Sequence, residues 1–567
     1  MLGNMQTRPA MSSTWADPVL SCAGARTLET HLFGGDEEKE WTAMQRAGTA
    51  VARALLEDFK EIGGFPANGR VLVLVGKGHN GGDALLAAAE ILSTRPEASA
   101  HVSFIFGERA LRPLAARAWR RLLETAGKND RVRPVAINVS EGTALVAADS
   151  GERSSYDLCL DGIFGFQFHP PVDAATAEVL RAVNSHPGIR LRAAVDLPSG
   201  VGEQAGDTFF RADFTYATGS VKAPILEEGN RAATGRLRYC DLGFFDRPVA
   251  GIADPGFANS ALHSASPAVQ LSAAVTNFVL NPSVLAPFAG LRAPLSDKRT
   301  FGHLFVIGGS RSYPGAALMC VRAALRSGVG LVTAFVPESL VPAFAATAPE
   351  AIWVGWPETP EGSLALEGLH LLRARLQRAT ALVVGSGLGP EAETHALVAE
   401  IVKLAEVPLV LDADALQPSN LAAARGKRVI CLPHAGEFKR LAGGREATPA
   451  VLRATAREAN ATVVLKGPVT QISDGDRIYH SLVGGPVLAR GGSGDLLAGL
   501  TGGVLAQTPD DTLLAACRGV VWHGMAADLL ARDRGQVAVQ VTQLLDHLPA
   551  ALRDSARPFF GKGISRV

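Results

Sequence analysis

The stretch that decides the fold is Arg490-Gly491-Gly492-Ser493-Gly494-Asp495, which leads directly into the apolar run Leu496 to Leu500. Closely spaced glycines ahead of a helical pattern let backbone N–H groups converge on an anion, because glycine has no Cβ and adopts positive φ at little cost. An aspartate beside such an anion can accept a proton. The motif therefore predicts an anion-binding helix N-terminus with a carboxylate next to it.

The composition describes a long chain with extensive buried structure. Its 567 residues are too many for one hydrophobic core, so we expect two large domains or three small ones. Hydrophobic residues make up 47% and charged residues 19%, which indicates a compact enzyme with much buried sheet. Lysine plus arginine equals aspartate plus glutamate at 55 each, so we expect neither nucleic acid nor a membrane as a partner.

The cysteines and the N-terminus indicate a reducing compartment. Six cysteines are scattered along the chain with no CxxC pair and no metal-ligand spacing, which favours free thiols. The first twenty residues contain no apolar signal segment, and we find no apolar run as long as a transmembrane helix. We therefore expect a cytoplasmic protein.

Strand-like and helix-like segments alternate in the first half of the chain. An apolar, β-branched run over residues 70–76 is followed by glycines and then by a helical pattern over 84–92. Further strand-like runs cover residues 103–106, 156–163 and 192–195. Apolar strands that alternate with helices predict a parallel sheet covered on both faces, and hence an α/β fold.

The second half repeats this alternation independently. Its expected strands are residues 304–307, 331–336, 381–384, 409–411, 429–432 and 462–465. Between the halves, residues 246–290 are rich in proline and show no sustained periodicity. We place the boundary near residues 260–275, which gives two domains over residues 20–250 and 275–555.

A glycine-rich segment follows the first strand of the first half. It is VGKGHNGGD, residues 75–83, and it lies where ligands bind in open α/β sheets. Its glycines would admit a phosphate or diphosphate, while Asn80 and Asp83 add an amide oxygen and a carboxylate. The alternative is a tight turn with Asp83 as the helix N-cap.

Oxygen-bearing side chains also follow two other strands of this half. Asp161 ends one strand, and Asp196 and Ser199 follow another. Because the carboxyl ends of parallel strands meet at one edge, we expect these residues and Asn80 to converge. Such hard oxygen donors suit a group 1 or group 2 cation.

Four motifs of the first half belong together: MQRAG (44–48), HNGGD (79–83), DGIFG (161–165) and VDLPSG (195–200). Their combination resembles the NAD(P)H-hydrate epimerase domain of the bifunctional NAD(P)H-hydrate repair enzymes, over about residues 20–245. The resemblance implies a Rossmann-like three-layer sandwich. The chain departs from the family pattern at His79 and Ala84 beside the glycines, and at Phe166 and Gln167, where the family has a GTG loop.

This resemblance implies the roles of residues in the first half. It assigns a potassium ion to Asn80, Asp161 and Ser199. It assigns hydrated NADH or NADPH to His79, Asn80, Gly81, Gly82, Asp83, Gly165, Phe166, Gln167, Phe168, His169, Pro170, Pro171 and Asp196. Asp196 is our candidate for the catalytic residue that moves the proton in epimerisation.

The second half carries its own ordered set of motifs: LFVIGGS (304–310), VVGSGLG (383–389), LDADAL (411–416), LPHAGE (432–437), VLKGPVT (464–470) and GGSGD (491–495). Their order resembles the ribokinase-like fold and, within it, the ADP- or ATP-dependent NAD(P)H-hydrate dehydratases, over about residues 275–555. The PHAGEF segment and the KG…T loop separate it from sugar kinases. Two departures are mild: Ser386 replaces a proline of the family, and Ser493 replaces a threonine.

This second resemblance implies a nucleotide site and a substrate site. It assigns AMP or ADP to Lys466, Gly467, Pro468, Val469, Thr470 and Gly494. It assigns the hydrated substrate to Ala316, Gly387, His434 and Asp495. We expect ADP, accompanied by Mg²⁺, as the donor. For Asp412 and Asp414 we favour turn and cap roles over a role in holding Mg²⁺ through water.

The chemistry of such a substrate fits the GGSGD motif. Hydroxide leaves a hydrated nicotinamide poorly, whereas phosphate leaves well. Asp495 would take the hydroxyl proton as the oxygen attacks the terminal phosphoryl group of the nucleotide. The N–H groups of residues 492–494 would stabilise the developing charge, at about 3 kcal/mol for each donor.

Three readings remain open at this point. The first is a repair enzyme that equilibrates the R and S hydrates and dehydrates the S form. The second keeps the fold but makes the C-terminal half a kinase for a small alcohol, with the first half as a binding module. The third makes the first half a scaffold with a degraded site. In each case we expect a homo-oligomer.

Overall fold

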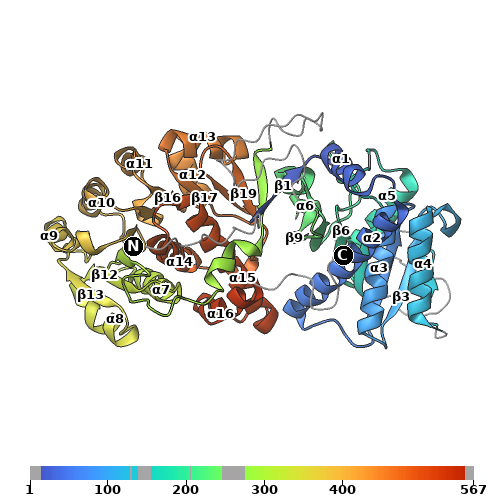
Figure 1. The fold of residues 1–567 in the computed structure, drawn as a ribbon, viewed down its shortest axis with the longest axis horizontal. Helices are drawn as coiled ribbons and strands as arrows, with labels where there is room; N and C mark the ends of the chain where they lie inside the picture. The colour runs from blue at the N-terminus through green and yellow to red at the C-terminus, as the bar shows by residue number, and fades with distance from the viewer. Residues whose placement is uncertain (1–14, 128–129, 138–154, 205, 246–274, 556–567) are drawn as a thin grey trace, which may run out of the picture.

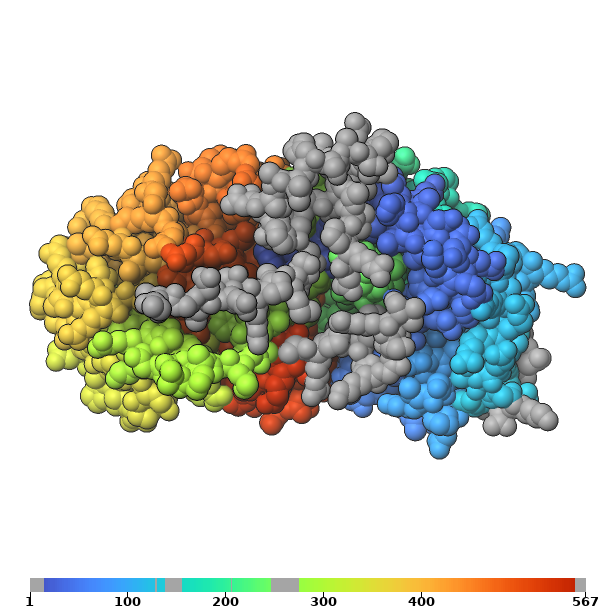
Figure 2. Space-filling model, in the orientation of Figure 1, coloured from blue at the N-terminus to red at the C-terminus, as the bar shows by residue number. Residues whose placement is uncertain are grey.

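Two β-sheets, one mainly from each half of the chain, organise the protein (Figure 1). The computed structural model describes residues 15–127, 130–137, 155–204, 206–245 and 275–555. The expected boundary segment lies almost wholly outside these residues, so the division into 20–250 and 275–555 stays a prediction. In the space-filling view, the yellow and orange part of the second half and the blue and cyan part of the first half occupy opposite ends (Figure 2).

Within the described residues, the first sheet has seven parallel strands in the order β4-β3-β2-β5-β6-β7-β9. These are β2 Arg70–Val75, β3 Ser99–Phe104, β4 Val132–Pro134, β5 Tyr156–Gly162, β6 Ile189–Val195, β7 Phe214–Thr218 and β9 Arg236–Cys240. Alternate side chains of β2 pack on α2 (Glu37–Asp58), α3 (His79–Thr94) and α4 (Pro113–Ala126) on one face, and on α5 (Ala174–Ser185) on the other. This is a three-layer α/β sandwich, as predicted.

Two local predictions for the first half are wrong. The strand expected over residues 103–106 is β3, which spans Ser99–Phe104 and so begins four residues earlier. Its start was missed because Ser99 and His101 are polar and interrupt the apolar pattern. The helix expected from residue 84 begins at His79, with Gly78 as its N-cap. Glycine is needed in this first turn for close packing, since a Cβ on Gly81 would lie 2.5 Å from the Gly76 carbonyl oxygen. The HNGGD residues are therefore helical, not a loop.

The second sheet has twelve strands within the described residues, in the order β13-β12-β11-β14-β15-β16-β17-β18-β19-β10-β1-β8. Its core strands are β11 His303–Ile307, β12 Leu331–Pro337, β13 Ile352–Trp356, β14 Ala381–Val384, β15 Leu409–Leu411, β16 Val429–Cys431 and β17 Thr462–Leu465, all parallel. The antiparallel strands β18 (Thr470–Ser473) and β19 (Ile478–Ser481) follow. The six expected strands are confirmed, while β13, β18 and β19 were not predicted from the sequence.

Helices cover both faces of this second sheet. One face packs against α7 (Pro314–Arg326), α14 (Ser493–Gln507), α15 (Thr512–Arg534) and α16 (Leu544–Ser555). The other packs against α9 (Leu369–Arg373), α10 (Ala392–Leu404), α11 (Pro418–Ala423), α12 (Ala435–Leu441) and α13 (Pro449–Ala459). The remaining helices are α1 (Cys22–Phe33), α6 (Arg231–Thr234) and α8 (Val341–Thr347).

The two halves of the chain share the second sheet. Strand β1 (Ala16–Leu20), from the start of the described chain, pairs with β10 (Asn277–Leu280) on one side. On its other side it pairs with β8 (Val221–Lys222), which belongs to the first half. In Figure 1, β1 lies where the two halves meet. Main-chain hydrogen bonds therefore run continuously from one half to the other.

A buried network of charges joins the halves a second time. Arg238 of β9 donates to Asp58 of α2 at 3.0 Å and to Asp528 of α15 at 3.0 Å. Arg532 of α15 donates to the same Asp58 at 2.8 Å. Burial raises the pKa of Asp58, but these two arginines outweigh it and lower the pKa to about 2. The network therefore stabilises the protein above about pH 4, and this stabilisation is lost as the pH falls toward 2.

Replacing Arg238 with methionine should destabilise the protein strongly. The change leaves Asp58 and Asp528 buried with fewer compensating charges, which typically costs about 3–5 kcal/mol. We expect a clearly lower midpoint of thermal unfolding at pH 7. The matched control is Arg121→Met, since the Arg121 side chain is 58% exposed and its ion pair contributes little. Equal midpoints for the two variants would contradict the role given to the network.

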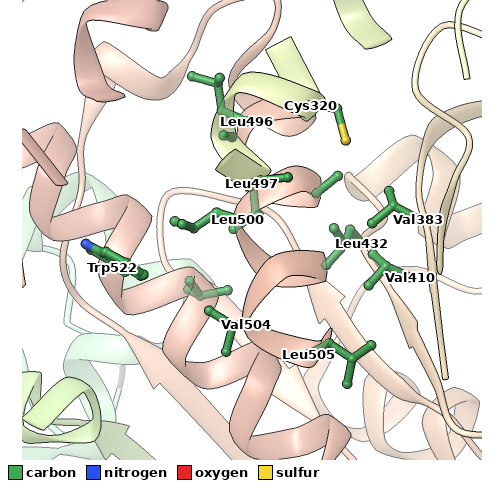
Figure 3. Close-up of a cluster of buried hydrophobic side chains, with 14 of the residues drawn as sticks. Cys320, Val383, Val410, Leu432, Leu496, Leu497, Leu500, Val504, Leu505 and Trp522 are labelled. Carbon is green, nitrogen blue, oxygen red and sulfur yellow. The ribbon is translucent and has the colours of Figure 1, made fainter. Parts of the chain in front are cut away.

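Helix α14 is held close to its neighbours by glycines. A Cβ on Gly499 would lie 1.9 Å from the Cys320 carbonyl oxygen of α7, and one on Gly502 would lie 2.2 Å from Val383 of β14. Figure 3 shows the apolar side chains of α14 packed around this contact, with Cys320 and Val383 beside them. The helix that carries the GGSGD motif is therefore fixed against both α7 and the sheet.

We predicted that no apolar run would reach the length of a transmembrane helix, and helix α15 contradicts this prediction. Helix α15 has the length of a membrane span and a mean hydropathy of 1.2 over its most apolar window. Most of that window, 78%, is buried inside the protein. Its apolar character follows from its place in the core between the sheet, α14 and α16.

Candidate active sites

The first half contains a cavity of about 770 Å³ at the carboxyl ends of its strands. Many of the predicted substrate residues line it: His79, Asn80, Asp83, Gly165, Phe166, Gln167, Phe168, His169, Pro171 and Asp196. Gly81, Gly82 and Pro170 do not. A Cβ on Gly82 would lie 2.7 Å from the Met44 sulfur, so this residue serves helix packing. His79 lies at the exposed mouth, 3.7 Å from Glu40.

Asp196 is the most strongly constrained residue of this cavity. It follows β6 with a φ of +65°, a conformation that non-glycine residues rarely adopt. Its Oδ1 accepts from the Lys222 ammonium at 2.5 Å, from the Thr218 amide at 3.3 Å and from the Thr218 hydroxyl at 3.4 Å. All three of these hydrogen bonds go to Oδ1. Asp196 lines the cavity, so Oδ2 is the oxygen that can bind a ligand there.

Lys222 was missed by the sequence analysis. Its side chain is 1% exposed, and its ammonium also donates to the Thr218 carbonyl at 2.9 Å. The Phe166 ring covers it, 5.2 Å from the nitrogen, so the bulky change in the family's GTG loop shields this ion pair. No local motif could have revealed Lys222, because it reaches Asp196 through the tertiary pairing of β6 with β7, whose last residue, Thr218, it also binds.

Of the four oxygen-bearing residues expected to converge, Asp161 and Ser199 are in direct contact. Asn80 is joined to Ser199 through the Phe164 backbone, and Asp196 is held separately by Lys222. The Ser199 hydroxyl and amide donate to the two oxygens of Asp161 at 2.6 and 2.7 Å. The Asn80 amide donates to the Phe164 carbonyl at 2.7 Å, and the Phe164 amide donates to the Ser199 hydroxyl at 2.9 Å. Asp161 is fully buried and forms no ion pair with any described residue. A negative charge on this buried group therefore has no compensating cation among the described residues.

Two further carboxyl groups face the cavity. Burial raises the pKa of Glu29, on α1, to about 7. Burial also raises the pKa of Asp83 well above its usual value, and the charges of Asp196 and Glu29 add to the effect. Both groups are therefore disposed to carry protons near neutral pH. Glu29 lies ahead of every motif in the sequence and was missed for that reason.

The GGSGD motif forms the start of α14. Gly492 is the N-cap with a φ of +90°, and Asp495 lies in the first turn. The Ser493 amide, expected to serve an anion, already donates to the Arg490 carbonyl at 3.3 Å and has a partner within the chain. Within the described chain, the amides of Gly494 and Asp495 have no such partner. These two donors and the positive end of the helix dipole are suited to an anion.

Lys466 and Asp412 lie directly against this helix start. The Lys466 ammonium donates to Asp412 at 2.9 Å and lies 3.9 Å from Glu437. A Cβ on Gly494 would be 3.3 Å from the Lys466 nitrogen and 3.8 Å from Asp412. Glycine at position 494 therefore leaves space beside the half-buried Lys466 ammonium. Asp412, 2% exposed, is part of the site and not only a turn residue.

Asp495 has the electrostatics of a general base. Burial, and then the charge of Asp412, raise its pKa to about 6, while Ser386 and Lys466 act in the opposite direction. Such a carboxylate is ionised at neutral pH and is still basic enough to accept a proton. For Lys466, burial lowers the pKa, but Asp412 and Glu437 outweigh it and raise the pKa overall.

The other predicted residues of the second half lie in loops and at helix starts. A Cβ on Gly387 would lie 2.9 Å from the Ala316 Cβ, so these two predicted substrate residues touch. His434 caps α12, accepting from the Gly436 amide at 3.0 Å, and its side chain is 62% exposed. Asp414 accepts from the Gly389 amide at 2.9 Å, which fits its expected turn role.

The predicted nucleotide loop is the turn between β17 and β18. Gly467 and Pro468 are exposed, and Thr470 begins β18. The Lys466 amide donates to the Pro433 carbonyl at 2.9 Å, which joins this loop to the PHAGEF segment. Val469 packs on the apolar cluster between the two halves, which also includes Leu197 and Phe166. The loop therefore presents backbone at the same strand edge as Asp495.

These two sites, a cavity in the first half and the start of α14 in the second, define a two-site α/β enzyme. Residues 304–550 match the family described as NAD(P)H-hydrate dehydratase, and residues 41–223 match the family described as YjeF-related protein N-terminus. Within the described chain the two matches fall on the two separate sites.

Relatives match along nearly the whole chain. The bifunctional NAD(P)H-hydrate repair enzyme of Moorella thermoacetica is 32% identical, over 90% of this chain and 92% of its own length. That of Gloeobacter violaceus is 33% identical, over 94% of this chain and 97% of its own. The chain belongs to the family of bifunctional NAD(P)H-hydrate repair enzymes. A Bacillus subtilis ADP/ATP-dependent NAD(P)H-hydrate dehydratase crystallised with ATP and Mg²⁺ is 28% identical, over 47% of this chain and 94% of that one, with a TM-score of 0.40.

Proposed function

We propose that this chain repairs hydrated NADH and NADPH at two separate sites. The cavity of the first half interconverts the R and S hydrates. The site at the start of α14 dehydrates the S form with ADP, accompanied by Mg²⁺, and yields AMP and phosphate. The observation that carries this proposal is the coincidence of both sites in one chain that is similar to bifunctional repair enzymes over nine-tenths of its length.

The site at α14 supports dehydration through phosphorylation. Asp495 takes the proton of the substrate hydroxyl, whose oxygen then bonds to the terminal phosphorus of ADP while the bond to AMP breaks. The amides of Gly494 and Asp495 and the Lys466 ammonium stabilise the charge on the transferred group. The ring nitrogen then pushes out phosphate, which leaves an iminium cation. The neighbouring ring carbon gives up a proton to the departing phosphate, and the dihydropyridine is restored.

The cavity supports epimerisation by ring opening. Oδ2 of Asp196 takes the proton of the hydroxyl group as the carbon–nitrogen bond of the ring breaks, and passes it to the ring nitrogen. Rotation of the resulting aldehyde and reversal of the same steps close the ring with the opposite configuration. Lys222 and Thr218 hold Oδ1 so that Oδ2 keeps its direction.

We infer a potassium site beside this cavity, at Asn80, Asp161 and Ser199. The donor set fits the ion, since amide, carboxylate and hydroxyl oxygens are hard ligands and Asp161 has no cationic partner among the described residues. Bound potassium would supply a fixed positive charge that neutralises Asp161.

Removal of potassium should therefore slow epimerisation. With tetramethylammonium as the only monovalent cation, we expect the epimerisation rate to fall by about tenfold. Losses of this size are typical when the residues around a metal ion are changed. Added potassium should restore it in the unmodified protein but not in Asp161→Asn. An epimerisation rate that is the same with and without potassium would contradict the proposed potassium site.

The overall function is tested by the recovery of NADH. Mixed R and S NADH-hydrate is incubated with ADP and Mg²⁺, and NADH absorbance and AMP are followed together. We expect full recovery, with one AMP for each NADH. Recovery that stops at the S fraction would make the first half a scaffold. Formation of a stable phosphoester without NADH would instead favour an alcohol kinase.

A further inference from the structure

Three phenylalanine side chains, Phe106, Phe164 and Phe168, form a row in the cavity of the first half. The Phe164 and Phe168 rings are stacked with their centroids 4.5 Å apart, and the Phe106 ring lies 5.9 Å from Phe164. All three residues line the cavity and are partly exposed. Aromatic surface that is open to a cavity favours a ligand with a flat, unsaturated ring.

The phenylalanine row is held in place from behind. Phe106 and Phe164 pack against the apolar cluster between the sheet and α5. The Phe168 amide donates to the Gly165 carbonyl at 3.0 Å, and this turn carries Phe168 back onto Phe164. The row is therefore formed before a ligand arrives, and little order has to be gained on binding.

Two cationic side chains stand at the Phe106 end of the row. The Lys77 ammonium lies over the Phe106 ring, 4.5 Å from its centroid. The Arg112 amide donates to the Lys77 carbonyl at 2.9 Å, and a Cβ on Gly78 would lie 4.0 Å from the Arg112 guanidinium. Both side chains line the cavity, and neither forms an ion pair with a described residue.

The acidic residues that line the cavity are engaged elsewhere. Glu40 lies 3.7 Å from His79, and Asp173 caps the start of α5. Asp196 is bound by Lys222. The two remaining carboxyl groups are those whose raised pKa disposes them to carry protons near neutral pH. The charge of Lys77 and Arg112 is therefore left for an anionic ligand.

The order of the strands separates this end of the cavity from the reacting end. Phe106 follows β3, whereas Asp196 follows β6, and β2 and β5 lie between those two strands. Neighbouring strands lie about 4.8 Å apart, so three spacings separate the two ends by about 14 Å. A dinucleotide carries its second base beyond a diphosphate. A substrate with its nicotinamide ring at Asp196 can therefore place its adenine on the row.

We propose that the phenylalanine row binds the adenine base of the hydrated dinucleotide, and that Lys77 and Arg112 bind one of its phosphate groups. This inference rests on the proposed epimerase function of the cavity and adds to it the recognition of the adenosine half of the substrate. The phosphate belongs either to the diphosphate, which both substrates contain, or to the 2′-phosphate, which only NADPH-hydrate contains.

The adenine contact is tested with Phe106→Leu and Phe168→Leu, which keep an apolar side chain at each end of the row but remove a ring. The KM for epimerisation is measured with NADH-hydrate and with the hydrate of reduced nicotinamide mononucleotide, which has no adenine. Loss of a base–aromatic stack should raise the KM for NADH-hydrate about tenfold in at least one variant. The KM for the mononucleotide hydrate should stay unchanged. An unchanged KM for NADH-hydrate in both variants, or an equal rise for the two substrates, would overturn the adenine assignment.

The phosphate contact is tested with Lys77→Met and Arg112→Met. Loss of a charge-assisted contact should raise the KM about tenfold. A rise for NADH-hydrate and NADPH-hydrate alike identifies the diphosphate, whereas a rise for NADPH-hydrate alone identifies the 2′-phosphate. A KM that is unchanged for both substrates in both variants would overturn the role given to these cations.

Control variants separate recognition from folding. Phe65→Leu removes a ring that packs edge-on against Phe59 outside the cavity, and Lys60→Met removes an exposed lysine. Both should leave every KM unchanged. Dehydration in the second half reports whether each variant is folded.

A binding measurement makes the test independent of epimerisation. NADPH is titrated into the unmodified protein and into the Phe106 and Phe168 variants by calorimetry, and the affinity of one site should fall about tenfold. An unchanged affinity in both variants would again overturn the adenine assignment. A lower affinity in a protein that interconverts no hydrate would support the adenine contact and overturn the proposed epimerase function instead.

Discussion

Replacing Asp495 with asparagine should abolish dehydration and leave epimerisation intact. The amide has the size of the carboxylate but cannot accept the substrate proton. Loss of a general base typically costs 10²- to 10⁴-fold, and we expect a loss in this range, about 10³-fold or more. The measurement is the initial rate of NADH formation from S NADH-hydrate with ADP. Asp510→Asn, which changes an exposed carboxylate of the same half, should behave as the unmodified protein.

The pH dependence of the same rate gives an independent check on Asp495. Because burial and Asp412 raise its pKa to about 6, the ionised form needed for catalysis is lost as the pH falls through that value. We expect the dehydration rate to halve near pH 6 and to fall about tenfold for each further unit. A rate that is level well below pH 6 would contradict the assignment of Asp495 as the base.

Replacing Asp196 with asparagine should abolish epimerisation and leave dehydration intact. Asparagine can keep the bonds from Lys222 and Thr218 through its oxygen, but its nitrogen cannot take a proton at the cavity side. We expect the rate to fall by about 10²- to 10⁴-fold, to that of spontaneous epimerisation. It is measured by chromatographic separation of R and S NADH-hydrate without ADP.

The controls for Asp196 test its surroundings. Asp207→Asn changes an exposed carboxylate of the same half and should have no effect. Lys222→Met should slow epimerisation too, since it leaves a buried carboxylate uncompensated at a cost of about 3–5 kcal/mol. Epimerisation at the normal rate in Asp196→Asn would remove this residue from the mechanism.

Much of the fold could be predicted from the sequence because each central strand is marked by its own short run of apolar residues. Runs such as residues 70–75 and 381–384 are apolar and β-branched and are followed by glycines. Strand β1 carries no comparable signal, because its five residues form a strand only through partners at residues 277–280 and 221–222. The sheet that joins the halves was therefore beyond sequence reasoning.

The candidate sites show the same division. Asp495, Asp161 and Ser199 follow strands or open a helix within recognisable motifs, and the structure brings the last two together. Lys222 and Glu29 belong to no motif, since only tertiary packing brings Lys222 to Asp196 and Glu29 to the cavity. The HNGGD residues were recognised but given the wrong conformation, because glycines that serve close helix packing and glycines that serve a loop have the same composition.

The central claim is that one chain holds two independent sites that act in sequence on the same metabolite. The most direct test mixes equal amounts of Asp196→Asn and Asp495→Asn with R and S NADH-hydrate, ADP and Mg²⁺. We expect Asp196→Asn alone to stop near the S fraction, Asp495→Asn alone to form no NADH, and the mixture to recover all of it at a rate well above spontaneous epimerisation. Recovery by the mixture no faster than by Asp196→Asn alone would contradict the claim.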